Sequence, residues 1–212
     1  GLINKVDIGT VVDYNIGTLL NTSTVFSGLY LATDADVIIA AIGNTMMLEG
    51  ENGDAILSTS GGDRNNLKLP ENQVELLRKL KKQAPEKPLV VIVTGGSAID
   101  LKEISELADA LLFAWYPGEQ GGNALADILF GTQNPSGRLP VTFYKSVDDL
   151  PAFDDYNMQN RTYRFFKESP LYPFGYGLSY STFQYSDAKI SNPVSEKEEI
   201  NITLAIKNTG LF

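Results

Sequence analysis

Three short apolar runs, each followed by a segment with helical periodicity, constrain the fold of this chain more than any other feature. The runs occupy residues 37–42, 89–93 and 111–115, and each soon gives way to Gly or Pro-Gly. The run at 37–42 predicts a strand that is buried on both faces of a sheet, the run at 89–93 predicts a second buried strand, and the run at 111–115 predicts a third strand. Strands that alternate with helices predict an α/β fold: an open, mostly parallel sheet with right-handed crossovers and helices on both faces.

Helix signals fit the intervals that follow these runs. The first helix is expected to open at 70–73, where Pro stands near the first turn. A short helix is expected after the second strand, with Asp100 as its cap and Glu103 reaching back to the helix start. The third helix is expected over about 120–130, where apolar residues recur on one face.

Outside these units the periodicity changes. Residues 1–33 show no clear element, and residues 139–143 predict a short edge strand. Residues 183–190 and 200–206 alternate with period two, which predicts strands. Because two strands do not form a stable module alone, we expect an all-β module that is truncated at the C-terminus. We therefore divide the chain into an irregular leader, 1–33, an α/β domain, 34–181, and the start of a β domain, 182–212.

Composition removes several classes of function. The 212 residues include no Cys and no His and carry a formal net charge of -9. Without these residues there is no disulfide, no thiol catalysis and no serine-histidine triad, and most zinc sites are excluded. The negative charge argues against nucleic acid or an anionic membrane as a partner. Catalysis by this chain would therefore rely on carboxylates, hydroxyls, Lys, Arg or the backbone.

The loop after the first predicted strand is the richest in chemistry. Ligands of open parallel sheets bind at the carboxyl ends of the strands, because the following loops converge there. This loop carries Glu49, Glu51 and Asp54, three carboxylates within six residues, which indicates an acid/base or cation site or else a solvated acidic loop. The spacing misses the EF-hand pattern of calcium ligands. The glycines at 95–96 and 118–122 match no nucleotide-binding pattern, so we interpret them as tight turns.

Two further segments leave alternatives open. Asp63 and Arg64 follow a pair of glycines and suit either an anion or sugar site or an internal ion pair that pins a long loop. The aromatic segment 173–180 suits a sugar-stacking platform, although packing of the rings within the fold is the simpler interpretation.

A series of motifs in fixed order carries a family resemblance. The motifs are LEGE (48–51), GDRNNLKLP (62–70), AWYPGEQGG (114–122), NPSGRLP (134–140), NRTYRFF (160–166) and PLYPFGYGLSY (170–180). Together with the first strand, they resemble the C-terminal region of glycoside hydrolase family 3 over about residues 34–208. The similarity is greatest to the β-xylosidase branch, and β-glucosidases share much of it.

The resemblance implies a domain of a retaining, exo-acting β-glycosidase that removes terminal sugars from xylo- or gluco-oligosaccharides without a cofactor or metal. In this family an N-terminal (β/α)8 barrel carries an Asp nucleophile, and the α/β sandwich domain supplies the general acid/base Glu. The motif match assigns that role to Glu51, leaves Glu49 to shape the sugar site, and leaves Asp63 and Arg64 to hold the loop. Residues 182–212 would then begin a fibronectin type III-like module.

The family mechanism also limits what this chain is expected to do. A (β/α)8 barrel needs roughly 200–250 residues of its own, so we expect this chain to lack the nucleophile and to be inactive alone. We expect the parent protein to be secreted or periplasmic. The alternative is a non-catalytic carbohydrate-binding or interaction module that reuses the fold.

Overall fold

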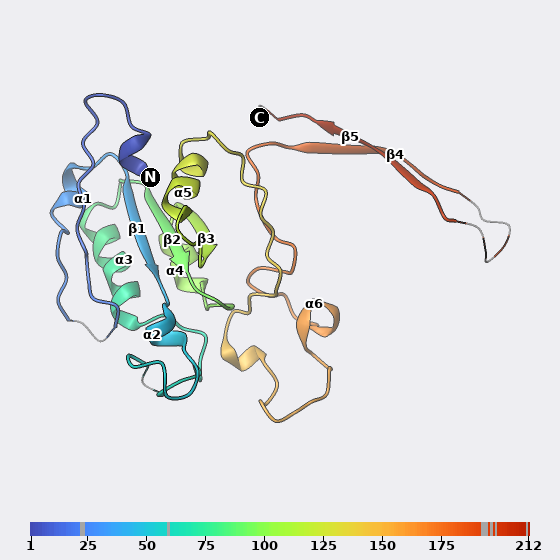
Figure 1. Ribbon diagram of the computed structural model, residues 1–212, viewed down its shortest axis with the longest axis horizontal. Coiled ribbons are helices and arrows are strands. Elements are labelled where there is room, and N and C mark those ends of the chain that lie inside the picture. Colours follow the sequence, from blue (N-terminus) through green and yellow to red (C-terminus); the bar gives the residue numbers. More distant parts are fainter. Residues whose placement is uncertain (22–23, 59, 192–194, 196, 198, 211) are drawn as a thin grey trace.

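A three-stranded parallel sheet forms the centre of the molecule. The computed structural model describes residues 1–21, 24–58, 60–191, 195, 197, 199–210 and 212. Its strands β1 (Ile38–Gly43), β2 (Leu89–Thr94) and β3 (Ala110–Trp115) lie in the spatial order β1-β2-β3 (Figure 1). Ile42 of β1 is paired with Val93 of β2, so the three carboxyl ends lie at one edge. The predicted parallel α/β sheet is confirmed.

The predicted helices follow the strands. They are α3 (Glu71–Gln83), α4 (Lys102–Leu107) and α5 (Gly121–Leu129). Pro70 stands immediately before α3, close to the first turn as expected. Asp100 accepts a hydrogen bond from the backbone N–H of Lys102 at 3.1 Å, but the N-cap of α4 is Leu101, so the expected cap lies one residue too early. Glu103 binds Arg78 of α3 and does not reach back to the helix start.

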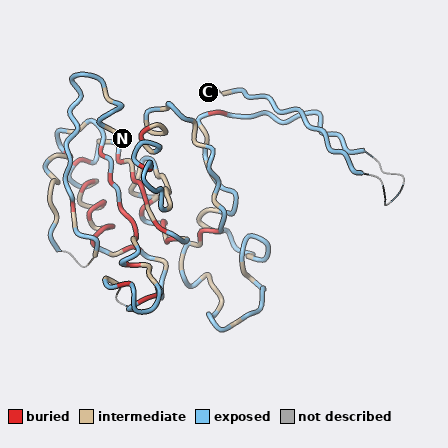
Figure 2. The backbone as a smooth tube through the Cα atoms, viewed as in Figure 1, coloured by how far each residue is buried: buried red, intermediate tan, exposed pale blue. Residues whose placement is uncertain are grey.

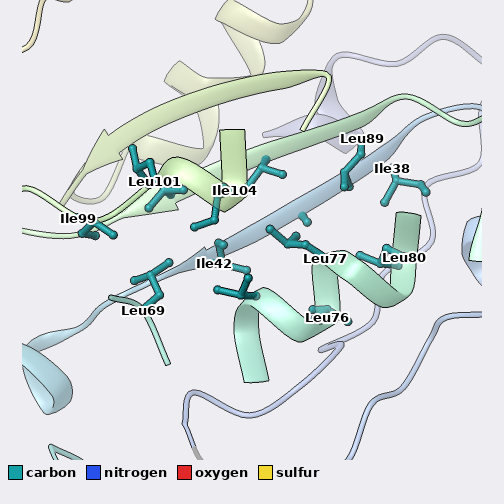
Figure 3. Close-up of a cluster of buried hydrophobic side chains, with 14 of the residues drawn as sticks. Ile38, Ile42, Leu69, Leu76, Leu77, Leu80, Leu89, Ile99, Leu101 and Ile104 are labelled. Carbon is teal, nitrogen blue, oxygen red and sulfur yellow. The ribbon is translucent and has the colours of Figure 1, made fainter. Parts of the chain in front are cut away.

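The hydrophobic core lies between one face of the sheet and the helices α3 and α4, which pack against each other. Side chains from both helices and from the strands meet in this layer (Figure 3). Figure 2 shows the buried residues concentrated in β1, β2 and α3. Within β1, Ile38, Ala40 and Ile42 are buried, whereas Ile39 is 38% exposed. The expectation that this run is buried on both faces was therefore wrong, because the described segments cover one face of β1 more completely than the other.

An ion-pair network joins α3 to α4 at the surface. The Arg78 guanidinium donates to Glu71 at 2.6 Å, to Glu75 at 3.0 Å and to Glu103 of α4 at 2.5 Å. We expect Arg78→Ala to lower the free energy of unfolding by about 1 kcal/mol, because exposed ion pairs contribute little individually. In about 1 M NaCl most of this difference should disappear by screening. Urea denaturation of both chains measures it.

A matched control is Lys82→Ala, which removes the same charge from the same helix but leaves the network intact. A destabilisation as large as that of Arg78→Ala would contradict the importance of the network, as would a difference that salt does not change.

The C-terminal half contains less regular structure. Residues 139–143 do not form the predicted edge strand, and Phe143 makes only an isolated antiparallel bridge with Tyr172. Pro140 lies within this segment and removes one of the backbone donors that a ladder would need. The short helices η2 (Val147–Asp149) and α6 (Thr162–Phe165) follow.

The end of the chain forms an antiparallel ribbon. Strands β4 (Phe183–Ile190) and β5 (Ile202–Asn208) pair with each other, which confirms the two strands expected there. The ribbon extends away from the sheet domain, and every residue in its two strands is exposed (Figures 1 and 2). The domain boundaries at 34 and 181 stay predictions.

The N-terminal segment is irregular, as expected, with only a turn of 3-10 helix, η1 (Leu2–Asn4), and the short α1 (Leu31–Asp34). Among the described residues, no helix combines the length and the apolar character that a membrane crossing requires.

Candidate functional site

The loop after β1 is folded back over the carboxyl edge of the sheet. β1 ends at Gly43, whose φ of 148° and close contact with the backbone of Thr94 leave no room for a side chain. The short helix α2 (Met46–Glu49) starts at once, and the Thr45 hydroxyl caps it by accepting from the N–H of Met47 at 3.3 Å. The last residue of α2 is Glu49, which therefore lies where the three strands end.

Four hydrogen bonds and one ion pair hold the carboxylate of Glu49. Its Oε2 accepts from the Tyr116 hydroxyl at 2.5 Å and from the Gly96 N–H at 3.0 Å. Its Oε1 accepts from the Asn44 amide at 3.1 Å and the Ser97 hydroxyl at 3.1 Å, and pairs with Arg64 at 3.0 Å. Asn44 follows β1, Gly96 and Ser97 follow β2, and Tyr116 follows β3. One carboxylate thus links the ends of all three strands.

These contacts keep Glu49 ionised. Burial of the side chain, which is 10% exposed, raises the pKa of Glu49. The hydrogen bonds from Tyr116 and Gly96 and the charge of Arg64 lower it by more, so the pKa lies below its ordinary value. Burial and the hydrogen bond to Glu49 raise the pKa of Tyr116 to about 12. At neutral pH the pair is therefore a carboxylate and a neutral phenol.

Arg64 brings the C-terminal end of the loop to Glu49 at the edge of the sheet. Its side chain is 16% exposed and donates to the Ser97 hydroxyl at 2.6 Å and the Ala98 carbonyl at 3.3 Å, besides its ion pair with Glu49. We call the Glu49–Arg64 ion pair the clasp, because it closes the loop formed by residues 50–63. Asp63 is exposed and forms no ion pair with Arg64, so the internal pair considered from the sequence is replaced by the clasp.

Glu51 lies within the loop that the clasp closes. Its backbone carbonyl accepts from the Asp54 N–H at 2.9 Å, and its side chain is exposed. Among the described residues, no group forms a hydrogen bond or an ion pair with the Glu51 carboxylate. The loop is compact, since the Gly53 N–H donates to the Gly61 carbonyl at 2.8 Å. Glu49 and Glu51 of the LEGE motif therefore lie two residues apart in different environments, since the first side chain is largely buried and the second is exposed.

The sequence did not identify Asn44, Ser97 or Tyr116 as site residues. The available signal was their position, because each follows a predicted strand directly or within a few residues. Tyr116 also lies inside one of the motifs quoted above. Within the described part of the chain, no group of three or more acidic residues is placed to hold a metal ion.

Comparison with known proteins places this chain in a family. A model of the glycosyl hydrolase family 3 C-terminal domain matches residues 23–180. The chain belongs to that family. This domain is 47% identical over 150 residues to a xylan 1,4-beta-xylosidase of Xylanibacter ruminicola, which covers 71% of this chain and 17% of that protein. It is 37% identical over 192 residues to a periplasmic beta-glucosidase of Salmonella typhimurium. That alignment covers 84% of this chain and 24% of the beta-glucosidase.

Solved structures of the family show the same fold. A GH3 exo-beta-xylosidase in complex with a xylobiose aziridine probe superposes with a TM-score of 0.71 at 33% identity, over 92% of this chain and 28% of that one. A beta-D-glucoside glucohydrolase from Trichoderma reesei superposes with a TM-score of 0.72 at 28% identity, over 86% and 29%. This family 3 domain thus spans less than a third of each of these relatives.

Proposed function

We propose that this domain supplies Glu51 as the general acid/base of a retaining, exo-acting β-glycosidase. The observation that carries the proposal is the contrast between the two glutamates after β1. A general acid/base must give up and regain a proton. Glu49 accepts four hydrogen bonds, pairs with Arg64 and has a lowered pKa, so it is a poor proton donor near neutral pH. The carboxylate of Glu51 is exposed and has no hydrogen-bond or ion-pair partner among the described residues.

The second carboxylate would come from another domain. A retaining mechanism needs two carboxyl groups about 5–5.5 Å apart, one on each side of the anomeric carbon. We assign the nucleophile to an Asp on an N-terminal (β/α)8 barrel that faces the Glu51 loop. Glu51 would protonate the leaving oxygen and then activate a water against the glycosyl-enzyme. Glu49 and Arg64 would shape the sugar site by holding this loop at the sheet edge.

The names of the relatives support a substrate class and a location. Two of them carry the names xylan 1,4-beta-xylosidase and periplasmic beta-glucosidase. These names support terminal xylose or glucose of an oligosaccharide as the sugar that is released, and a secreted or periplasmic location.

Hydrolysis of nitrophenyl xyloside and nitrophenyl glucoside, compared side by side, tests the proposed function. We expect the chain alone to release no nitrophenol, because it would supply one of two carboxyls. The same chain joined to its barrel domain should release it, and the faster substrate identifies the sugar. Sustained turnover by the chain alone that is lost in Glu51→Gln would contradict the division of labour between two domains.

A further inference from the structure

A pocket lies beside α6, outside the group of residues that contact Glu49. Its volume is about 250 Å³, and it is lined by three aromatic rings, two prolines, Thr142 and Glu168. We call it the α6 pocket. Sites for drug-sized ligands measure roughly 300–1,000 Å³, so the α6 pocket is of a size for a single ring.

Aromatic rings form the apolar part of the α6 pocket. Tyr163 and Phe174 are stacked with their ring centroids 4.5 Å apart and their planes at 26°. Both are well exposed, Tyr163 at 63% and Phe174 at 47%. Phe166 also lines the pocket. Electron-rich ring faces attract the weakly positive C–H groups on the face of a sugar ring, so exposed rings of this kind suit a pyranose.

Two polar side chains that have no partner among the described residues complete the lining. Thr142 is only 7% exposed, and its hydroxyl oxygen is buried without a hydrogen-bond partner in the part of the chain that the structure describes. Burying a hydroxyl without a partner is unfavourable, so a free hydroxyl at the edge of a pocket needs a reason. The carboxylate of Glu168 likewise has no hydrogen bond or ion pair with any described residue. Sugar hydroxyls both donate and accept, so they can satisfy both groups.

The backbone holds Tyr163 in a preset position. The preceding Thr162 has a φ of 55°, a left-handed conformation that is rare for a β-branched residue. Its N–H donates to the Tyr144 hydroxyl at 3.2 Å, and the Tyr144 ring packs edge-on against Phe166 with centroids 5.0 Å apart. Strained backbone of this kind persists where the surroundings impose it, often at binding sites.

The α6 pocket is connected to the edge of the sheet that carries the Glu51 loop. Phe143, next to Thr142, packs edge-on against Phe113 and Trp115 of β3, with centroids 5.0 and 6.3 Å away. Trp115 is the last residue of β3. In Figure 1, α2 and α6 both lie in the lower half of the view, α2 directly after β1 and α6 to the right of the sheet.

We propose that the α6 pocket binds a sugar unit of the oligosaccharide other than the terminal unit that is cleaved. The ring would lie against Tyr163 or Phe174, and its hydroxyls would bond to Glu168 and Thr142. This inference rests on the proposed function, because it concerns a longer substrate of the same enzyme.

The test uses two substrates and the chain joined to its barrel domain. A β-glycosyl fluoride has no group beyond the cleaved sugar, whereas a tetrasaccharide of the same sugar reaches further subsites. We expect Phe174→Ala to lower kcat/KM for the tetrasaccharide by about tenfold, through KM, as for loss of one anchoring aromatic contact. Hydrolysis of the fluoride should be unchanged. Phe153→Ala, which removes an exposed ring outside the α6 pocket, is the matched control and should change neither.

A second variant separates binding from folding. Thr142→Val removes the unpartnered hydroxyl, so it should raise the Tm while weakening hydrolysis of the tetrasaccharide. The inference is overturned if Phe174→Ala affects the two substrates equally or neither of them, or if Thr142→Val leaves the tetrasaccharide unaffected. If the unaltered enzyme cleaves neither substrate, the proposed function fails instead, so the two failures are distinguishable.

Discussion

Replacing Glu51 by Gln in the barrel-containing enzyme is expected to slow hydrolysis of an oligosaccharide by about 10²–10⁴-fold, the usual contribution of a general acid/base. The leaving alkoxide of a sugar needs a proton as the bond breaks, and Gln cannot supply one. A dinitrophenyl glycoside has a leaving group that departs without protonation, so formation of its glycosyl-enzyme should stay fast. Hydrolysis of that intermediate should become slow, because activation of water also needs Glu51.

The measurement is kcat and KM for both substrates, together with a burst of dinitrophenol at short times. Asp54→Asn is the control, because it removes an exposed carboxylate from the same loop. It should change kcat by less than about threefold. A rise in KM with an unchanged kcat in Glu51→Gln would instead favour the non-catalytic carbohydrate-binding alternative, since that pattern reports lost binding.

Loss of the clasp should have the largest effect on stability. Removing one partner of a buried ion pair costs about 3–5 kcal/mol, because the other charge is left unpaired. For Arg64→Leu we expect the lower end, about 3 kcal/mol, since Glu49 keeps four uncharged donors. Urea denaturation measures the change in the free energy of unfolding. Asp63→Asn is the control and should be nearly neutral, because Asp63 is exposed and outside the clasp.

The effect of Arg64→Leu should also depend on pH. The pKa of Glu49 is lower in the folded chain than its ordinary value, so folding is favoured by the ionised form. That contribution is complete above the unfolded pKa, about 4.3, and is lost as the pH falls through the folded pKa. The difference between the unaltered chain and Arg64→Leu should therefore shrink on acidification from neutral pH. A difference that stays constant down to acid unfolding would show that the charge of Glu49 plays no part.

Much of the fold was predictable because it depends on local pattern. The apolar runs at 89–93 and 111–115 became β2 and β3, since strands of this composition need a sheet and the following glycines end them. The helix after Pro70 was predictable for the same reason. Parallel strands place all their carboxyl ends at one edge, so the position of Glu49 and Glu51 at that edge also followed from the sequence.

Only the tertiary structure distinguished the two glutamates. Glu49 and Glu51 have the same chemistry and are two residues apart, but only Glu49 meets Arg64 and Tyr116. Those partners lie 15 and 67 positions along the chain, and they are brought together by strand register and by the path of a loop. Sequence pattern sets which segments form strands and helices. Which side chains pair, and which carboxylate stays free, depends on distances that exist only after those segments have packed.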